Sequence, residues 1–147
     1  MTSVVLDNAA LDALAGSASE AKGMIRAAIT AAVRHQREVV VPAVVLAEMY
    51  RGRHHNQVVD ACLSRETGLT IRDTDRAMAR LVGGILSAAD RGTADMVDAH
   101  VVGAAVERGG GICLTGDPDD LAALAAPYPS VEVVDVNRGL PLPDRPV

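Results

Sequence analysis

The chain has 147 residues, the length of one ordinary domain, so a second independent core is not expected. Hydrophobic residues make up 49% and charged residues 22%, which excludes intrinsic disorder. With 14 basic against 19 acidic residues, the formal net charge of −5 excludes a broad basic face for nucleic acid. Without Phe or Trp, the chain also cannot build an aromatic platform on which single-stranded bases stack.

The sequence carries no signal for a membrane or for export. No apolar run approaches the roughly 20 residues that cross a bilayer. The first residues lack the basic region, long apolar stretch and cleavage site of a signal peptide. Cys62 and Cys113 lie in apolar segments without metal-ligand spacing, which is typical of buried, reduced thiols. We therefore expect a cytoplasmic protein with no membrane segment.

Short β-branched runs alternate along the chain with long Ala-rich helical stretches. This alternation predicts an α/β fold in which helices cover a central parallel sheet of about five strands. The runs are continuously apolar, as central strands buried on both faces are, and only the last run carries polar residues typical of an edge. The expected strands are residues 4–6, 39–41, 69–71, 112–114 and 131–136.

Capping residues predict where the helices begin and end. Ser17 or Ser19 can cap a helix that ends near Arg37. Pro42 suits the first position of the next helix, and Gly52 is expected to end it. Further helices are expected over residues 9–14, 57–65, 75–89, 94–108 and 118–124. Asp73 or Thr74 can cap the helix over 75–89, and Thr93 can cap the helix over 94–108.

One domain is expected over residues 1–136. The remaining stretch, 137–147, contains Pro141, Pro143 and Pro146 and predicts an irregular, Pro-rich C-terminal tail. No repeat or linker interrupts the chain.

Four acidic residues fall near the expected carboxyl ends of the strands. Asp7 directly follows the first strand, and Asp117 follows the fourth after two residues. Glu48 and Asp98 lie about one to one and a half turns into helices that begin near the same edge. Because ligands of open α/β sheets gather at this edge, the four carboxylates are expected to share one cleft.

Four carboxylates in one cleft repel one another and favour a compensating cation. Oxygen ligands suit Mg²⁺ or Mn²⁺, whereas zinc would require closely spaced His or Cys. Mg²⁺ keeps several waters, orients a nucleophile and neutralises a phosphate, so phosphodiester hydrolysis is the expected chemistry. Each acid also has a structural explanation, because Asp7, Asp98 and Asp117 could cap or support helices and Glu48 could be a surface residue.

In this order and at these spacings, the acids resemble those of the PIN-domain ribonucleases, and in size and layout the VapC-type toxins of bacterial toxin-antitoxin pairs. The resemblance covers about residues 3–136 and is carried by the segments VVLDNAAL (4–11), PAVVLAE (42–48), VDAHVV (97–102) and LTGDPDDL (114–121). It implies that catalysis and metal binding depend on Asp7, Glu48, Asp98 and Asp117.

The resemblance also assigns accessory roles and a function. Thr115 corresponds to the hydroxyl that accompanies the fourth acid, and Asp95 is an accessory candidate. Whether Asp119 or Asp120 joins the site is left open by the resemblance. Asn8 replaces the small or hydroxyl residue that is more usual there. The family implies a PIN-like α/β/α sandwich, an endoribonuclease that uses Mg²⁺ or Mn²⁺, an RNA substrate, a homodimer and neutralisation by a small antitoxin protein.

Two further expectations rest on the residues themselves. Arg51 and Arg53 lie in the densest basic segment and could hold RNA phosphates, or they could simply support a helix end. A group of apolar helix residues offers more surface than one small sheet can cover and favours a homodimer, unless all of them face the sheet. This group is Met24, Ile25, Met78, Leu81, Val82, Ile85 and Leu86.

Two other function classes require residues that this sequence lacks. A haloacid-dehalogenase-like phosphotransferase would need a second Asp where Ala9 stands, and a receiver domain would need a lysine near its end, whereas Lys22 is the only lysine. The open alternatives are a non-catalytic PIN-like binding module and a solitary housekeeping PIN nuclease. His100 is expected to be a packed or hydrogen-bonded histidine rather than a base.

Overall fold

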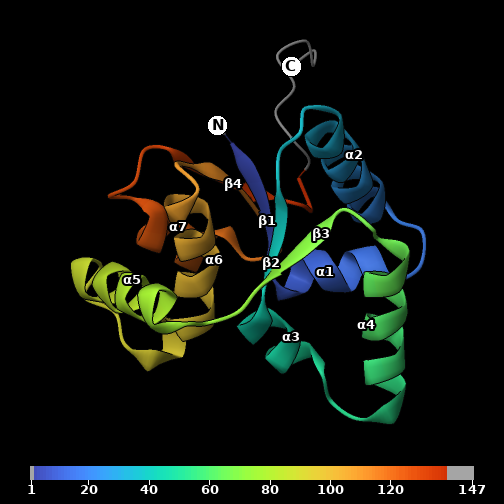
Figure 1. Cartoon of the computed structure of the whole chain (residues 1–147), viewed down its shortest axis with the longest axis horizontal. Helices are drawn as coiled ribbons and strands as arrows, with labels where there is room; N and C mark the ends of the chain where they lie inside the picture. Colours follow the sequence, from blue (N-terminus) through green and yellow to red (C-terminus); the bar gives the residue numbers. More distant parts are fainter. Residues whose placement is uncertain (1, 139–147) are drawn as a thin grey trace.

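A five-stranded parallel sheet forms the centre of the fold in the computed structural model, which describes residues 2–138. Its strands run in the order β3-β2-β1-β4-β5, and every pairing is parallel. The strands are β1 (Ser3–Leu6), β2 (Val39–Pro42), β3 (Leu69–Arg72), β4 (Gly111–Thr115) and β5 (Val131–Asp135). Figure 1 shows α1, α2 and α4 on one face of the sheet and α5, α6 and α7 on the other. The α/β/α sandwich predicted from the sequence is therefore confirmed.

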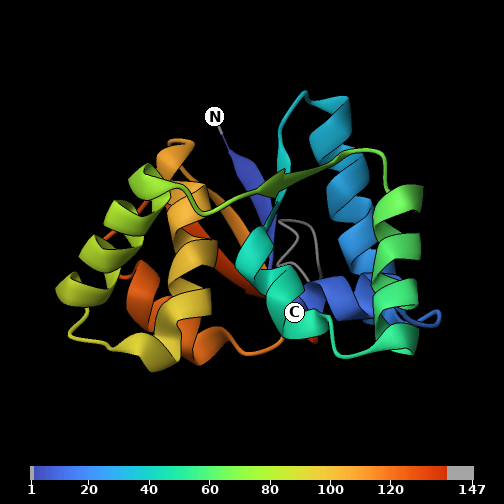
Figure 2. The ribbon, with the colours of Figure 1, turned by 60° about the horizontal axis from the view of Figure 1, so that its bottom comes forward.

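Seven α-helices and one 3₁₀ turn connect these strands within residues 2–138. They are α1 (Asn8–Ala15), α2 (Glu20–Arg34), α3 (Ala43–Met49), α4 (Arg53–Arg65), α5 (Arg76–Ala88), the 3₁₀ turn η1 (Thr93–Asp95), α6 (Met96–Glu107) and α7 (Pro118–Ala125). None of these helices is both long and apolar enough to span a bilayer. Figure 1 shows α3 at one end of the sheet, and Figure 2, in which this end comes forward, shows α3 in front and next to α1. Helix α3 also contacts α4.

The core is built on the three central strands. The side chains of Val5, Val40 and Cys113 are fully buried, as the continuously apolar runs predict. Cys62 and Cys113 are free and buried, so both cysteines act as small apolar side chains. This arrangement fixes the carboxyl ends of β1 and β4 next to each other.

The third strand differs from the prediction. Residues 69–71 were expected to be buried on both faces, but β3 is an edge strand that pairs only with β2. Thr70 is exposed, and Ile71 is 38% exposed. The segment 69–71 is only three residues long and carries a polar residue, Thr70, so it is too short to separate an edge strand from a central one by its pattern.

The segment between β2 and α4 also corrects the prediction. Pro42 is the last residue of β2 and precedes α3 rather than starting it, and α3 already ends at Met49. Gly52 does not end α3 but precedes α4, with a φ of 114° that other residues rarely adopt. As a result, α4 starts at Arg53, one turn earlier than expected.

Helix caps were predicted with mixed success. Ser19 caps α2 by accepting a hydrogen bond from the Lys22 N–H, which decides between the two predicted caps, Ser17 and Ser19. At the start of α5 the cap is Asp75, not Asp73 or Thr74. Thr93 does not cap α6 but begins η1, and α6 starts only at Met96. The Pro-rich tail predicted after β5 falls, from residue 139 on, outside the described residues.

The apolar helix residues that favoured a homodimer are largely buried within one chain. Ile25, Met78, Val82, Ile85 and Leu86 belong to the core, and the two other members of the group, Met24 and Leu81, pack against it. The reason is that α6 lies between the sheet and α5, so α5 finds its apolar partner within the same chain. The surplus of apolar surface expected from the sequence is therefore absent from these helices.

A pair of glycine substitutions tests how tightly the two central strands pack. A Cβ at Gly111 would overlap the Ser3 hydroxyl and lie 2.7 Å from the Ser3 carbonyl oxygen. We expect Gly111→Ala to lower the free energy of unfolding by about 1–3 kcal/mol. Gly23→Ala is the matched control, because a Cβ there meets nothing within 4 Å and alanine favours helix. Urea unfolding measures both, and equal stability of the two variants would contradict this packing.

Candidate active site

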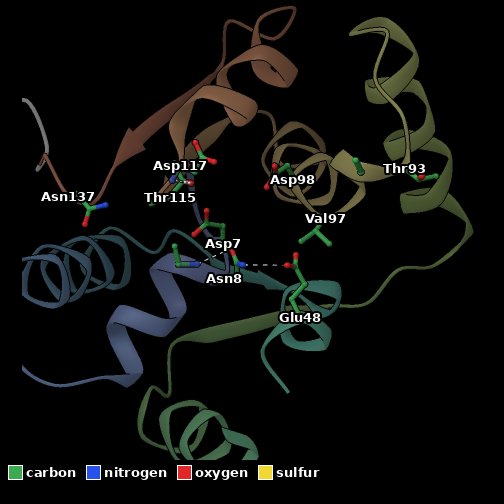
Figure 3. A pocket seen from close by; sticks show the side chains of 12 residues that line it. Asp7, Asn8, Glu48, Thr93, Val97, Asp98, Thr115, Asp117 and Asn137 are labelled. Carbon is green, nitrogen blue, oxygen red and sulfur yellow. Dashed lines mark hydrogen bonds between the residues drawn. The ribbon is translucent and has the colours of Figure 1, made fainter. Parts of the chain in front are cut away.

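A cleft of about 600 Å³ opens at the carboxyl ends of β1 and β4 (Figure 3). All four acids singled out in the sequence line it, namely Asp7, Glu48, Asp98 and Asp117. The cleft also contains Thr115, which was expected to accompany the fourth acid. Parallel strands end at one edge of a sheet, and this topology brings together side chains that lie up to 110 positions apart in the sequence.

Asp7 combines a structural and a site position. Its Oδ1 accepts a hydrogen bond of 2.8 Å from the Ala10 N–H and so caps α1, while the residue is only 3% exposed. Burial raises the pKa of the Asp7 carboxyl above its ordinary value, although contacts with the Thr115 hydroxyl and with backbone N–H groups lower it in part. The charge of Glu48 raises this pKa further. The same carboxylate therefore caps α1 and lines the cleft.

Glu48 reaches the cleft from α3 and is exposed to solvent. The side-chain amide of Asn8 donates to Glu48 Oε2 at 3.5 Å, as the dashed line in Figure 3 marks. Asn8 Oδ1 in turn accepts from the Ala9 N–H at 3.0 Å, which directs the amide nitrogen toward Glu48. The unusual Asn8 thus contacts one of the four acids directly.

Asp98 lies in the first turn of α6 and is half-buried. Burial is the main cause that raises its pKa to about 6, and the charges of Asp7, Asp120, Asp95 and Glu48 add to the effect. A carboxyl group that is surrounded by other carboxylates resists ionisation, as expected for an acidic site that favours a cation.

Asp117 and Thr115 are placed by the end of β4. The Asp117 N–H donates to Thr115 Oγ1 at 3.0 Å, and Thr115 is fully buried. Between them, Gly116 lies so close to α1 that a Cβ there would be 2.8 Å from the Ala9 Cβ. Only glycine therefore lets the segment after β4 pack this closely against the start of α1, beside Asp7.

A second acidic group adjoins the cleft. Carboxylate oxygens of Asp95, Asp98 and Asp120 all lie within 4.8 Å of one another, and no other acidic group within residues 2–138 is this compact. Arg91 forms ion pairs of 3.4 Å with both Asp95 and Asp120. Two of these three carboxylates are therefore already neutralised in part, whereas Asp98 belongs to both groups.

The four cleft acids have no such counterion. Within residues 2–138, no Lys, Arg or His forms an ion pair with Asp7, Glu48, Asp98 or Asp117. No three of these four are as compact as the group beside Arg91, which fits their mutual repulsion. The cleft is thus a concentration of uncompensated negative charge lined by oxygen donors.

The remaining candidates occupy different positions. Arg51 lies beside the cleft, and its Nη1 donates to the carbonyls of Ala47 and Tyr50 at the end of α3. Arg53 is exposed at the start of α4 and lines neither this cleft nor the cavity next to it. His100 is buried, and its Nδ1 lies 2.7 Å from the Met96 carbonyl oxygen, which confirms the prediction of a packed, hydrogen-bonded histidine.

Three polar residues near the site were missed or left open. Asn137 lines the cleft just after β5, and the rule of strand ends could have found it. Thr93 lines it from η1. Asp120 joins Asp95 and Asp98 from α7, and its spacing of three residues from Asp117 was the available signal.

No family model and no curated protein matches the sequence. Among solved structures, a chain of DNA-bound VapBC from Salmonella typhimurium superposes with a TM-score of 0.66, at 17% identity, over 92% of this chain and 99% of that one. A chain of VapBC2 from Rickettsia felis, bound to a promoter DNA fragment, gives a TM-score of 0.60 at 12% identity, over 90% and 97%. The PIN-like fold implied by the sequence resemblance is thereby confirmed.

The raised pKa of Asp98 predicts how stability depends on pH in metal-free buffer. Because the folded-state pKa of about 6 exceeds the ordinary value of 3.8, the folded state binds this proton more tightly than the unfolded chain. The contribution of Asp98 to the free energy of unfolding therefore falls as the pH rises from about 4 to 6. We expect Asp98→Asn to remove this decline and to stabilise the protein at pH 7 by about 1 kcal/mol after solvent screening.

Asp119→Asn is the matched control for this measurement. Asp119 is exposed and lies in the first turn of α7, and its substitution removes the same charge. It lines neither the cleft nor the cavity beside it. Thermal melts in EDTA between pH 4 and 8 should show stabilisation for Asp98→Asn only. A marked loss of stability in Asp98→Asn would instead make this acid a structural residue.

Proposed function

We propose that this protein is a metal-dependent endoribonuclease that hydrolyses RNA phosphodiester bonds and acts as the toxin of a toxin-antitoxin pair. The main support is the convergence of four carboxylates on one cleft, with no ion-pair partner for any of them within residues 2–138. These are Asp7, Glu48, Asp98 and Asp117. A purely structural domain has no need for four uncompensated carboxylates at one edge of its sheet. This observation favours an enzyme over a PIN-like binding module without turnover.

The donor set fits a hard divalent cation. All ligands on offer are carboxylate, hydroxyl or amide oxygens, and no His or Cys lines the cleft. We assign Asp7, Glu48, Asp98 and Asp117 to this cation, because Arg91 already occupies the other two acids near Asp98. Bound there, Mg²⁺ or Mn²⁺ would supply a water of lowered pKa and would offset the charge of a phosphate.

The residues of the chain prepare this site in distinct ways. The hydrogen bond from the Ala10 N–H holds Asp7 in place, and the Thr115 hydroxyl lies between Asp7 and the N–H of Asp117. Asn8, the chain neighbour of Asp7, donates a hydrogen bond to Glu48 and so helps to orient it (Figure 3). Most of these groups are therefore fixed before substrate binds, which lowers the cost of assembling the site.

RNA as the substrate and an antitoxin as the partner are supported by the family resemblance and by the fold shared with VapBC chains. A solitary nuclease of the same fold would have the same cleft but no dedicated partner. Co-purification of this chain with the product of an adjacent small reading frame distinguishes the two. We further propose that Arg51 and Arg53 hold RNA phosphates that flank the scissile bond. Arg51 lines the cavity next to the cleft, whereas Arg53 lines neither cavity and would hold a phosphate farther along the strand.

Removal of single cleft carboxylates tests the activity. We expect Asp7→Asn and Asp98→Asn to lower Mg²⁺-dependent RNA cleavage by about a hundredfold or more, because each change removes a charge on which cation and water positioning depend. Asparagine remains a good helix cap, so Asp7→Asn should stay folded. EDTA should abolish cleavage by the native chain, and Mn²⁺ should restore it.

A second pair of variants decides which acids hold the cation. Asp117→Asn should weaken Mn²⁺ binding by calorimetry, whereas Asp120→Asn, which removes an acid paired with Arg91, should change it little. The reverse result would move the cation to Asp95, Asp98 and Asp120. If the native chain binds Mn²⁺ but cleaves no RNA under any condition, the non-catalytic binding module becomes the better description.

We retain the homodimer as part of this proposal on the strength of the family resemblance alone. Within residues 2–138, the large exposed apolar residues are Val33, Val58, Ile71 and Met96, and they come from four different elements. We expect light scattering at micromolar concentration to give twice the chain mass of 15.2 kDa. A value that stays at one chain mass across this range would contradict the dimer.

A further inference from the structure

A second cavity continues the acidic cleft toward α4. It has a volume of about 280 Å³ and lies among residues of α1, α3 and α4, which are neighbours in Figure 2. The two cavities share Asn8, Ala9 and Glu48, so the hydrogen bond from Asn8 to Glu48 lies on their common boundary. Together they form one continuous groove, and we call its second part the α4 groove.

The chemistry of the α4 groove differs sharply from that of the acidic cleft. Ala15, Met49, Val58 and Val59 give it an apolar lining, and Val58 is 37% exposed. Its basic groups are those of Arg51 and His55, its carboxylates are those of Asp12 and Glu48, and Asn8 adds an amide. An apolar surface bordered by donors suits a nucleoside whose phosphate lies at the edge.

Hydrogen bonds within the chain hold the α3 and α4 sides of the α4 groove in place. The Tyr50 hydroxyl donates to Asp60 Oδ1 at 2.6 Å and ties the end of α3 to the middle of α4. Arg51 uses Nη1 for its bonds to the Ala47 and Tyr50 carbonyls. Its Nε and Nη2 make no hydrogen bond within residues 2–138, so these N–H groups are free for a phosphate.

The charges on the opposite side of the cleft set the direction of a bound strand. There, Arg91 is engaged by Asp95 and Asp120, and the wall is acidic. On the α4 side, Arg51 and His55 lie against the cavity. Asp12 and Glu48 line the α4 groove as well, so the difference between the two sides lies in the arginines: Arg51 forms no ion pair within residues 2–138, whereas Arg91 forms two. A phosphate adjacent to the scissile one can therefore pair with Arg51 on the α4 side.

We propose that the α4 groove is the binding subsite for the nucleotide adjacent to the scissile phosphate of a single-stranded RNA. The sugar and base lie on Met49, Val58 and Val59, and the phosphate accepts hydrogen bonds from Arg51 and His55. The inference rests on the proposed ribonuclease function and adds the position and direction of the substrate. A stacked duplex cannot place one nucleotide in a groove of this size, so the subsite selects unpaired RNA.

Neighbouring residues supply matched variants for the test. His55→Gln is compared with His54→Gln, since His54 is exposed but lines neither cavity. Val58→Glu is compared with Val33→Glu, an exposed valine on α2 outside both cavities. Binding of a short fluorescein-labelled single-stranded RNA is followed by anisotropy in Ca²⁺ buffer, and a denaturing gel confirms that the RNA stays intact.

We expect His55→Gln to weaken RNA binding about threefold and Val58→Glu about tenfold or more, while both controls stay within about twofold of the native chain. Mn²⁺ affinity should be unchanged in all four variants, because none of them alters a cleft acid. A duplex of the same sequence should bind more weakly than the single strand and should not respond to either groove variant.

The outcomes separate this inference from the function on which it rests. A native chain that neither binds Mn²⁺ nor cleaves RNA overturns the ribonuclease itself. A native chain that does both, with unchanged RNA affinity in His55→Gln and Val58→Glu, overturns the subsite alone. If Val58→Glu keeps its RNA affinity but loses a partner polypeptide, the α4 groove is a protein-docking surface instead.

Discussion

Electrostatic repulsion among four carboxylates is the constraint around which this molecule is organised. Asp7, Glu48, Asp98 and Asp117 come from four separate elements, and the sheet brings them to one edge against their mutual repulsion. The buried central strands supply the free energy that offsets this cost. Stability and site chemistry therefore oppose each other here, as they do at many sites that bind cations.

The counterions around the cleft are distributed unevenly. Arg91 neutralises the acids on one side, while the N–H donors of Arg51 and His55 lie on the other, next to an apolar cavity. Because the net charge is −5, a polyanion can be attracted only close to these few basic groups. In the proposed function, the local placement of a few cations supplies the attraction to RNA that the overall composition does not.

Much of this arrangement was predictable from the sequence, and the reasons are specific. Asp7 and Asp117 follow apolar runs that become β1 and β4, and parallel strands must end at the same edge. The pairing of Arg91 with Asp120 was not predictable, because it joins residues that lie 29 positions apart in the chain and meet only through tertiary packing. The burial of the apolar face of α5 was also missed, since it depends on α6 being covered on both sides. Gly103 lies at the contact between α6 and α5, where a Cβ would be 3.3 Å from Met78 Sδ.

The strand order has a consequence for how the protein forms. β1 pairs with β4, so Ser3 lies opposite Gly111, more than 100 positions away in the chain. Contacts of such high sequence separation are costly in loop entropy and form late in folding. A nascent chain that lacks β4 has no partner for this side of β1 and no Asp117 beside Asp7. The acidic cleft is thus completed only after β4 and the segment that carries Asp117 have been synthesised.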